Sequence, residues 1–131
     1  MKVDMHEHWE RTLTAIELLE IELVVRDFVT ILNEGSDHDI HAFLTEDVTY
    51  QPSAREIVRG RAAVVSMIRD IRGTFTDWHT ELVSLAVSGQ VVLAELAMCL
   101  TLPATGPQWV MGFASFRVDN FRISAWHQVH A

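Results

Sequence analysis

The segment Val91-Val92-Leu93-Ala94-Glu95-Leu96-Ala97-Met98-Cys99-Leu100-Thr101-Leu102 decides the fold of this chain. As an extended strand it is apolar on both faces, and it carries one carboxylate, Glu95, near its middle. An isolated ionised carboxylate in apolar surroundings is costly, so it either acquires a partner or takes up a proton with a raised pKa. We therefore expect Glu95 to be functional and the rest of the chain to form a pocket around it.

Further segments with a period of two residues surround this strand. Short turn signals, Ser88-Gly89-Gln90 and Asp119-Asn120 among them, separate these segments and are typical of hairpins. The pattern predicts a meander of long antiparallel strands over residues 78–87, 91–102, 109–118 and 122–130.

The first half of the chain has helical periodicity instead. Helices are predicted over residues 9–33, with a break near Thr14, and over residues 36–44 and 61–72, with Gly35 and Gly73 as stops. Short extended segments are predicted at 47–51, ended by Pro52, and at 56–59. Helices followed by strands predict an α+β fold: a cone-shaped, curved mixed sheet wrapped on N-terminal helices, with a pocket at its open end. Residues 1–131 are expected to form a single domain, with residues 1–15 as an N-terminal arm.

Composition excludes several classes of function. The 131 residues carry a net charge of −8 and a single lysine, which argues against binding to nucleic acid or to an anionic membrane. No apolar run approaches the ~20 residues of a membrane span, and the polar N-terminus does not resemble a signal peptide, so we expect a cytoplasmic protein. A lone cysteine, Cys99, excludes an internal disulfide and a cysteine-based zinc site. No short-spaced pair of metal ligands is present, since His127 and His130 face opposite sides of one strand, so we expect no metal. We also expect no cofactor.

Alternation within each strand assigns side chains to faces. Glu95 shares its face with Leu93, Ala97 and Cys99. On the first long strand, His79 shares a face with Glu81, Val83 and Leu85. On the last strand, one face holds Ser124, Trp126, Gln128 and His130.

Several motifs resemble the limonene-epoxide-hydrolase family. They are Tyr50-Gln51, Gly60, Gly89, Phe116-Arg117-Val118 and Arg122-Ile123-Ser124-Ala125-Trp126, and the similarity runs from about Glu20 to the C-terminus. That family belongs to the nuclear-transport-factor-2-like superfamily, together with SnoaL-type polyketide cyclases and ketosteroid isomerases. The resemblance implies a curved sheet with three helices, a deep apolar pocket and a homodimer formed sheet to sheet.

The resemblance also implies the site residues. The family tyrosine that holds the attacking water matches Tyr50, while the other catalytic positions of the family are occupied here by Pro52, Glu95, Ala97 and Gln128. The ketosteroid-isomerase base falls on Gln51. The implied polar set is Tyr50, His79, Glu95, Gln128 and His130. The implied substrate-binding positions are Val29, Leu32, Thr76, His79, Ala97, Cys99, Val110, Gly112, Trp126 and His130.

Our leading hypothesis is an acid/base enzyme in which Glu95 transfers the proton while Tyr50, His79 and Gln128 assist. The substrate would be a hydrophobic, oxygenated small molecule, and the reaction epoxide opening, ring closure or isomerisation. Two alternatives remain open: a non-catalytic module that binds a hydrophobic ligand, and a filled pocket that leaves only a dimerisation surface. The location of the Glu95 carboxylate, inside the pocket or outside it, distinguishes the hypotheses.

Overall fold

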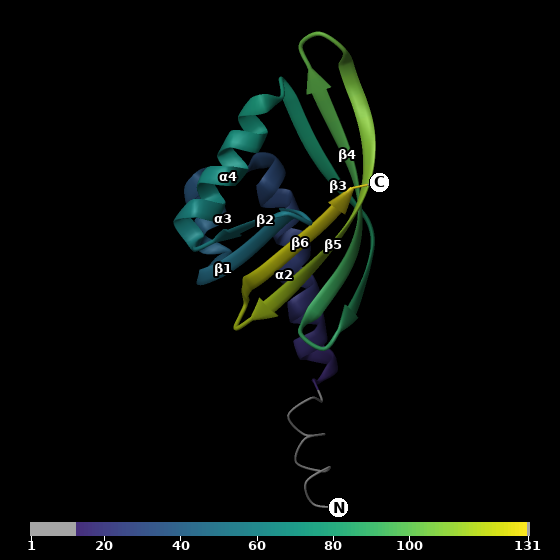
Figure 1. Ribbon diagram of the computed structural model, residues 1–131. Coiled ribbons are helices and arrows are strands. Elements are labelled where there is room, and N and C mark those ends of the chain that lie inside the picture. The colour runs from purple at the N-terminus through teal and green to yellow at the C-terminus, as the bar shows by residue number, and fades with distance from the viewer. Residues whose placement is uncertain (1–12, 131) are drawn as a thin grey trace, which may run out of the picture.

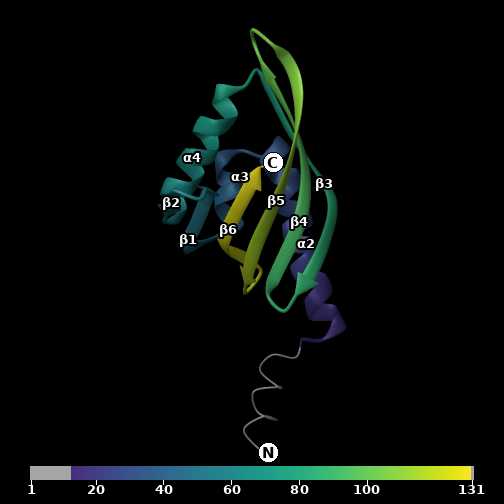
Figure 2. The same cartoon turned by 45° about the vertical axis from the view of Figure 1, so that its right-hand side comes forward.

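The computed structural model describes residues 13–130, and of His130 only the backbone. Most of the predicted arm, residues 1–12, lies outside the described residues. Helices α2, α3 and α4 lie on one side of a curved sheet, and the hairpin joining β4 and β5 extends past them (Figures 1 and 2). The elements in chain order are α2 (Ala15–Glu34), α3 (Asp37–Ala42), β1 (Leu44–Ser53), β2 (Glu56–Arg59), α4 (Arg61–Thr74), β3 (Asp77–Ser88), β4 (Val91–Leu102), β5 (Gly106–Asp119) and β6 (Arg122–His130).

Capping residues fix where the first helix begins and ends. Helix α2 starts at Ala15, where the break was expected, because Thr14 and Glu17 form a reciprocal capping box. It ends before Gly35, whose φ of −80° any residue could adopt. A Cβ at Gly35 would instead lie 2.6 Å from the Ile31 Cγ2 atom and 2.7 Å from the Ile31 carbonyl oxygen, so close approach requires the glycine. Gly73 does not end α4, which continues to Thr74.

The strands form one mixed sheet in the order β2-β1-β6-β5-β4-β3. Strands β1 and β6 pair in parallel, and the other neighbours pair antiparallel. Strand β1 is longer than predicted because it continues through Pro52 to Ser53. Its pairing with β2 is irregular between Tyr50 and Ser53, and a proline is tolerated where the ladder needs no N–H donor.

The two faces of the sheet differ sharply. We call the face covered by the helices the concave face and the opposite one the outer face. On β4 the concave face carries four buried side chains, whereas Glu95 lies on the outer face together with Leu93, Ala97 and Cys99. The four buried side chains are Val92, Ala94, Leu96 and Met98.

A β-bulge in β3 changes which side chains share a face. Leu82 pairs with Leu96, but the next pair is Ser84 with Glu95, which makes Val83 the extra residue. As a result His79 and Glu81 lie on the outer face and Leu85 lies on the concave face. The expectation that His79, Glu81 and Leu85 share one face is therefore wrong.

Aromatic rings form the centre of the core under the concave face. The Trp126 ring stacks on Tyr50 with centroids 4.1 Å apart and on Phe116 at 5.6 Å, and its edge meets Phe28 at 5.4 Å. All four rings are buried. This packing contributes several kcal/mol of apolar burial and fixes the position of β6 against α2.

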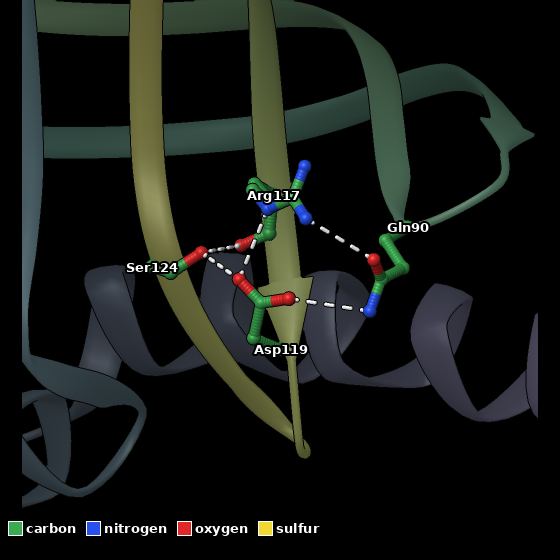
Figure 3. Close-up of polar contacts among 4 residues, drawn as sticks. All are labelled: Gln90, Arg117, Asp119 and Ser124. Atoms are coloured by element: carbon green, nitrogen blue, oxygen red, sulfur yellow. Dashed lines mark hydrogen bonds and ion pairs between the residues drawn. The ribbon is translucent and has the colours of Figure 1, made fainter. Parts of the chain in front are cut away.

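A polar cluster joins two hairpin turns at the end of the sheet opposite the β4–β5 hairpin (Figure 3). The Asp119 carboxylate accepts hydrogen bonds from Gln90 Nε2 (3.2 Å), Arg117 Nε (3.1 Å) and the Ser124 hydroxyl. Arg117 Nη2 also donates to Gln90 Oε1 at 3.1 Å. The β3–β4 turn is thereby held against the β5–β6 turn, which gives this cluster a structural role.

Candidate functional site

The concave face is packed at one end and less covered at the other. Along β4, Leu96 and Met98 are buried, but Leu100 and Leu102 are only half-buried, and Val110 on β5 is likewise half-buried. Polar residues lie at the boundary between the two parts. We call this region the open end. It comprises Trp78, Thr80, Met98, Leu100, Val110, Gly112 and Gln128, and the stacked rings of Tyr50 and Trp126 lie on the packed side of it.

Small residues on β5 let side chains from β6 and β4 meet. Gln128 is paired with Ala114 in register, and the next concave position on β5 is Gly112. Over this low surface the Gln128 amide reaches β4, and Nε2 lies 3.4 Å from the sulfur of Met98. Gln128 is therefore a buried hydrogen-bonding group, and its predicted assisting role stays a prediction.

Tyr50 presents a neutral hydroxyl. The ring is buried against Trp126, and burial, followed by the charge of Glu56, raises the pKa of Tyr50 to about 12. Desolvation penalises the phenolate more than the phenol, so the hydroxyl keeps its proton at neutral pH. It can therefore donate a hydrogen bond to a ligand oxygen but cannot serve as a base there.

Three buried side-chain atoms have no hydrogen-bond partner among the residues that the structure describes. They are the hydroxyl oxygens of Thr45 and Thr80 and the indole nitrogen of Trp126, and of these Thr80 lies at the open end. Such atoms are rare in folded proteins, and each calls for an explanation. The sequence analysis gave Trp126 only as an implied substrate-binding position and did not single out Thr80. The signal for Thr80 was its alternation with the apolar Trp78 and Leu82.

Two surface grooves border the open end. One, of about 460 Å³, lies between α2 and β3, and both Val29 and Thr80 line it. The other, of about 530 Å³, runs along the ends of β1 and β6, and Gln128 lines it. The buried polar residues at the two sides of the open end are thus both adjacent to an opening.

Glu95 does not belong to this region. Its carboxylate lies on the outer face, where Oε1 accepts a hydrogen bond from the Ser84 hydroxyl at 3.1 Å. A groove of about 500 Å³ surrounds it, lined mainly by apolar side chains such as Leu93, Phe113 and Val129. The expectation that Glu95 converges with Tyr50 and Gln128 is wrong, because the sheet separates the carboxylate from both.

The other predicted site residues divide between the faces. Val29 and Leu32 of α2 face the sheet, and the concave face includes Val110, Gly112 and Trp126. The predicted site residues on the outer face are His79, Ala97 and Cys99.

On the outer face, His79 Nε2 lies 3.5 Å from Glu81 Oε1, with both side chains about half exposed. Thr76 is exposed before β3, and its N–H donates to the Thr101 carbonyl. His130 pairs with Gly112 through the backbone, and its side chain lies outside what is described.

The described side chains, those of residues 13–129, include no group of three or more His, Cys, Asp or Glu placed to hold a metal ion. Over the same residues, no helix is both long enough and apolar enough to span a membrane.

The curved sheet with helices on its concave face is the fold of solved structures described as ketosteroid isomerase-like and ntf2-like. Residues 25–126 match the model of the SnoaL-like domain. The chain belongs to the SnoaL-like family. This confirms the resemblance and the fold class inferred from the sequence.

Solved structures share this fold at low sequence identity. An LEH-like epoxide hydrolase of M. tuberculosis has a TM-score of 0.78 and 21% identity over 88% of this chain and 85% of that chain. The epoxide hydrolase/cyclase-like enzyme SalBIII, described in pyran ring formation in salinomycin, has a TM-score of 0.78 and 19% identity over 86% and 92%. A protein with a ketosteroid isomerase-like fold from Catenulispora acidiphila has a TM-score of 0.76 and 14% identity over 82% and 85%. A search of curated proteins found no match.

Proposed function

We propose that this chain binds a hydrophobic, oxygen-bearing small molecule at the open end of the concave face. Half-buried apolar side chains, Leu100, Leu102 and Val110 among them, supply the apolar contact. Tyr50, Thr80 and Gln128 supply hydrogen bonds. Apolar walls with a few convergent polar groups are the usual composition of a small-molecule site.

The observation that carries the proposal is the neutrality of the buried polar set. Thr80 and Gln128 are the buried polar residues among those described, the Tyr50 hydroxyl keeps its proton, and Glu95 lies on the other face. A site of this kind recognises carbonyl, hydroxyl or ether oxygens and has no charged group to offer an ionic ligand.

The same groups favour one type of chemistry as a second candidate function. Epoxide hydrolysis needs a base to activate water, whereas ring closure of an epoxy alcohol uses a nucleophile already held close by. The internal hydroxyl oxygen would attack an epoxide carbon while the epoxide C–O bond breaks. The epoxide oxygen gains one proton and the attacking hydroxyl loses one, so the product is an isomer. Tyr50 would donate its hydrogen bond to the developing alkoxide.

The test compares the binding affinity of a terpenoid epoxide with that of the corresponding hydrocarbon. Tryptophan fluorescence measures both affinities. We expect the epoxide to bind more tightly, and Tyr50→Phe to weaken epoxide binding about tenfold without weakening hydrocarbon binding. Glu95→Gln is the matched control on the outer face and should change neither affinity. Equal affinities of both molecules for every variant, or absence of binding, would refute the proposal.

Product analysis with an epoxy alcohol tests the second candidate. A cyclic ether isomer, lost in Tyr50→Phe and retained in Glu95→Gln, supports ring closure. A diol, or loss of turnover in Glu95→Gln, contradicts it and restores a role for the carboxylate.

A second copy of the chain is our proposed partner for the outer face. Six large apolar side chains are exposed there: Val83, Leu93, Trp109, Met111, Phe113 and Val129. Their exposed fractions reach 61% for Trp109 and 67% for Val129. Together they expose about 600 Å², at the upper end for a monomer and close to the ~800 Å² that each partner contributes to a standard interface.

The same face carries both projections and a hollow, which favours self-association over an unrelated partner. Trp109, Met111 and Phe113 project in a row from β5, next to the small Ala97 and the groove around Glu95. A two-fold symmetric interface must be self-complementary, and two sheet faces pack by interdigitating such side chains.

Sedimentation or light scattering tests this partner. We expect a particle of about twice the 14.9 kDa chain mass, and dissociation when Phe113→Glu places a charge on the outer face. Ile16→Glu, on an exposed position of α2, is the matched control and should remain dimeric. A wild-type monomer at every concentration would contradict the proposal.

A further inference from the structure

Glu95 and His127 lie at opposite corners of a four-cornered patch on the outer face. The patch comprises two rows of paired residues, one of Glu95, Phe113 and Val129 and the next of Leu93, Ser115 and His127. Two strand spacings and two residues along a strand separate the opposite corners, which puts Glu95 and His127 about 12 Å apart. Both residues line the groove on this face, yet they are too far apart to pair within one chain.

The Glu95 carboxylate has few hydrogen bonds in the single chain. Among the described residues, its side chain accepts one, from the Ser84 hydroxyl to Oε1 at 3.1 Å. A carboxylate has about four acceptor sites, so the others are left to solvent while the groove is open. A second copy on the outer face would exclude that solvent, and an ionised carboxylate buried without a partner is strongly destabilising. The proposed dimer therefore requires a donor for Glu95 from the second copy.

His127 is the available donor on this face. Its imidazole is exposed and makes no hydrogen bond or ion pair with the residues that the structure describes. The protonatable groups on the two strands beside Glu95 already have partners. Arg117 of β5 donates to the Asp119 carboxylate. His79 of β3 lies 3.5 Å from Glu81.

We propose that the outer face forms a two-fold dimer in which His127 of each copy donates to Glu95 of the other. This rests on the proposed second copy, since it names the polar contact that the same interface requires. A two-fold axis lying in the interface, near the diagonal from Leu93 to Val129, brings each Glu95 over the second copy's His127. The same axis sets each Leu93 and each Val129 against its own counterpart. The strands of the two sheets then cross steeply, as in orthogonal sheet packing.

A carboxylate in an otherwise apolar patch makes the outer face selective. Any apolar surface could cover Leu93, Phe113 and Val129, but a surface without a donor would leave Glu95 buried and unpaired. Two copies related by the axis satisfy both carboxylates at once. The outer face therefore discriminates a second copy of this chain from other apolar surfaces.

Charge reversal tests whether the two residues meet across the interface. Glu95→Arg alone sets an arginine against the second copy's His127, and His127→Glu alone sets two carboxylates together. We expect each single variant to weaken dimerisation by at least about tenfold in sedimentation equilibrium. The double variant reverses the pair and should dimerise within about fivefold of the wild type. An equimolar mixture of the two single variants should form a heterodimer, because each carries the charge that the other lacks.

Controls separate the pair from general effects of charge and from misfolding. Asp27→Arg and His38→Glu make the same changes of charge on helices α2 and α3, on the concave side of the sheet, and should leave the dimer intact. Circular dichroism establishes that each variant is folded. Where a reversed charge unfolds the chain, Glu95→Gln and His127→Asn give the same test, because their effects on the dissociation constant should be non-additive.

The outcomes distinguish this inference from the dimer itself. If the single variants dimerise as tightly as the wild type, or the double variant no more tightly than either of them, the inference is wrong and the dimer stands. A restored double variant with a monomeric mixture would place the contact within one chain and overturn the inference as well. A wild-type monomer at every concentration would overturn both.

Discussion

The carboxamide of Asn33 holds both backbone groups of Thr80. Asn33 Nδ2 donates to the Thr80 carbonyl oxygen and Oδ1 accepts from the Thr80 N–H, each at 2.7 Å. Strand β3 is the last strand of the sheet, so on this side no further strand could satisfy these groups. A helix side chain thus replaces a strand neighbour and fixes Thr80 at the open end.

Replacing this side chain should loosen the edge of the sheet. Asn33→Ala removes two hydrogen bonds and should lower the free energy of unfolding by about 2 kcal/mol, measured by denaturant titration. Asn33→Asp keeps the acceptor and loses the donor, so its free energy of unfolding should lie between those of the wild type and Asn33→Ala. Thr30→Ala, one turn earlier on α2, is the control and should change stability little. An unaltered denaturant midpoint for Asn33→Ala would show that these two hydrogen bonds contribute nothing to stability.

Tyr50 is the only tyrosine of the chain, so its ionisation can be followed directly by phenolate absorbance. The folded protein should titrate near pH 12, and the denatured protein near 10. Burial is the larger cause of the raised Tyr50 pKa and the charge of Glu56 is the smaller one. Glu56→Gln should therefore lower the Tyr50 pKa of the folded protein only slightly. Circular dichroism at each pH establishes that the chain is still folded. A folded value near 10 would contradict the burial of the hydroxyl.

The same raised pKa predicts how stability depends on alkaline pH. The folded state holds the Tyr50 proton more tightly than the unfolded state, so its contribution is fully present below pH 10 and is lost as pH rises toward 12. Tyr50→Phe should flatten that part of the stability profile, a difference of about 2 to 3 kcal/mol at its largest. A profile identical to that of the wild type would refute the linkage.

Two glycines should respond in opposite directions to the same substitution. Gly35→Ala places a methyl group 2.6 Å from the Ile31 side chain and 2.7 Å from its carbonyl oxygen, so it should destabilise the chain by more than about 1 kcal/mol. Gly73 lies inside α4, and a Cβ there has nothing within 4 Å. Gly73→Ala should therefore stabilise by about 0.5–1 kcal/mol through helix propensity. Thermal unfolding measures the stability of both variants. A change in the same direction for Gly35→Ala and Gly73→Ala would contradict this account.

The Asp119 cluster should control how tightly the two hairpin turns are held. Asp119→Ala removes the acceptor for Gln90, Arg117 and Ser124. Because the side chains are partly exposed, we expect a loss of only about 1 kcal/mol. Amide exchange should quicken at Val118, whose N–H donates to the Gln90 carbonyl. Asp77→Ala, an exposed acid at the other end of the sheet, is the control and should not change exchange at Val118.

The ends of the strands were largely predictable from sequence, because turn residues mark them. Strand β4 runs over Val91–Leu102 as the apolar segment indicated, and the turn at Gly89 lies where the hairpin signal placed it. The face of Glu95 was not predictable by alternation alone, since both faces of β4 are apolar. The presence of a lone carboxylate on one face was itself the better signal, because glutamate is rarely buried without a partner.

His79 illustrates a different limit. Its own face follows from its pairing with Cys99, but the bulge at Val83 reverses the alternation for the rest of β3. A bulge is set by how two strands pair, not by the residues of one strand, so local sequence gives little warning of it. The unpaired state of Thr80 and Trp126 is equally a property of packing, and no motif in the sequence indicates it.

The low surface formed by Gly112 and Ala114 has a consequence for how this chain could diversify. These two residues set how far side chains of β6 can lean across the sheet, although neither carries a polar group. One added methyl or isopropyl group at either position would limit how far Gln128 can reach across the sheet while leaving every polar group in place. If the proposed function holds, the length of the bound molecule and the hydrogen bonds that recognise it are set by different residues.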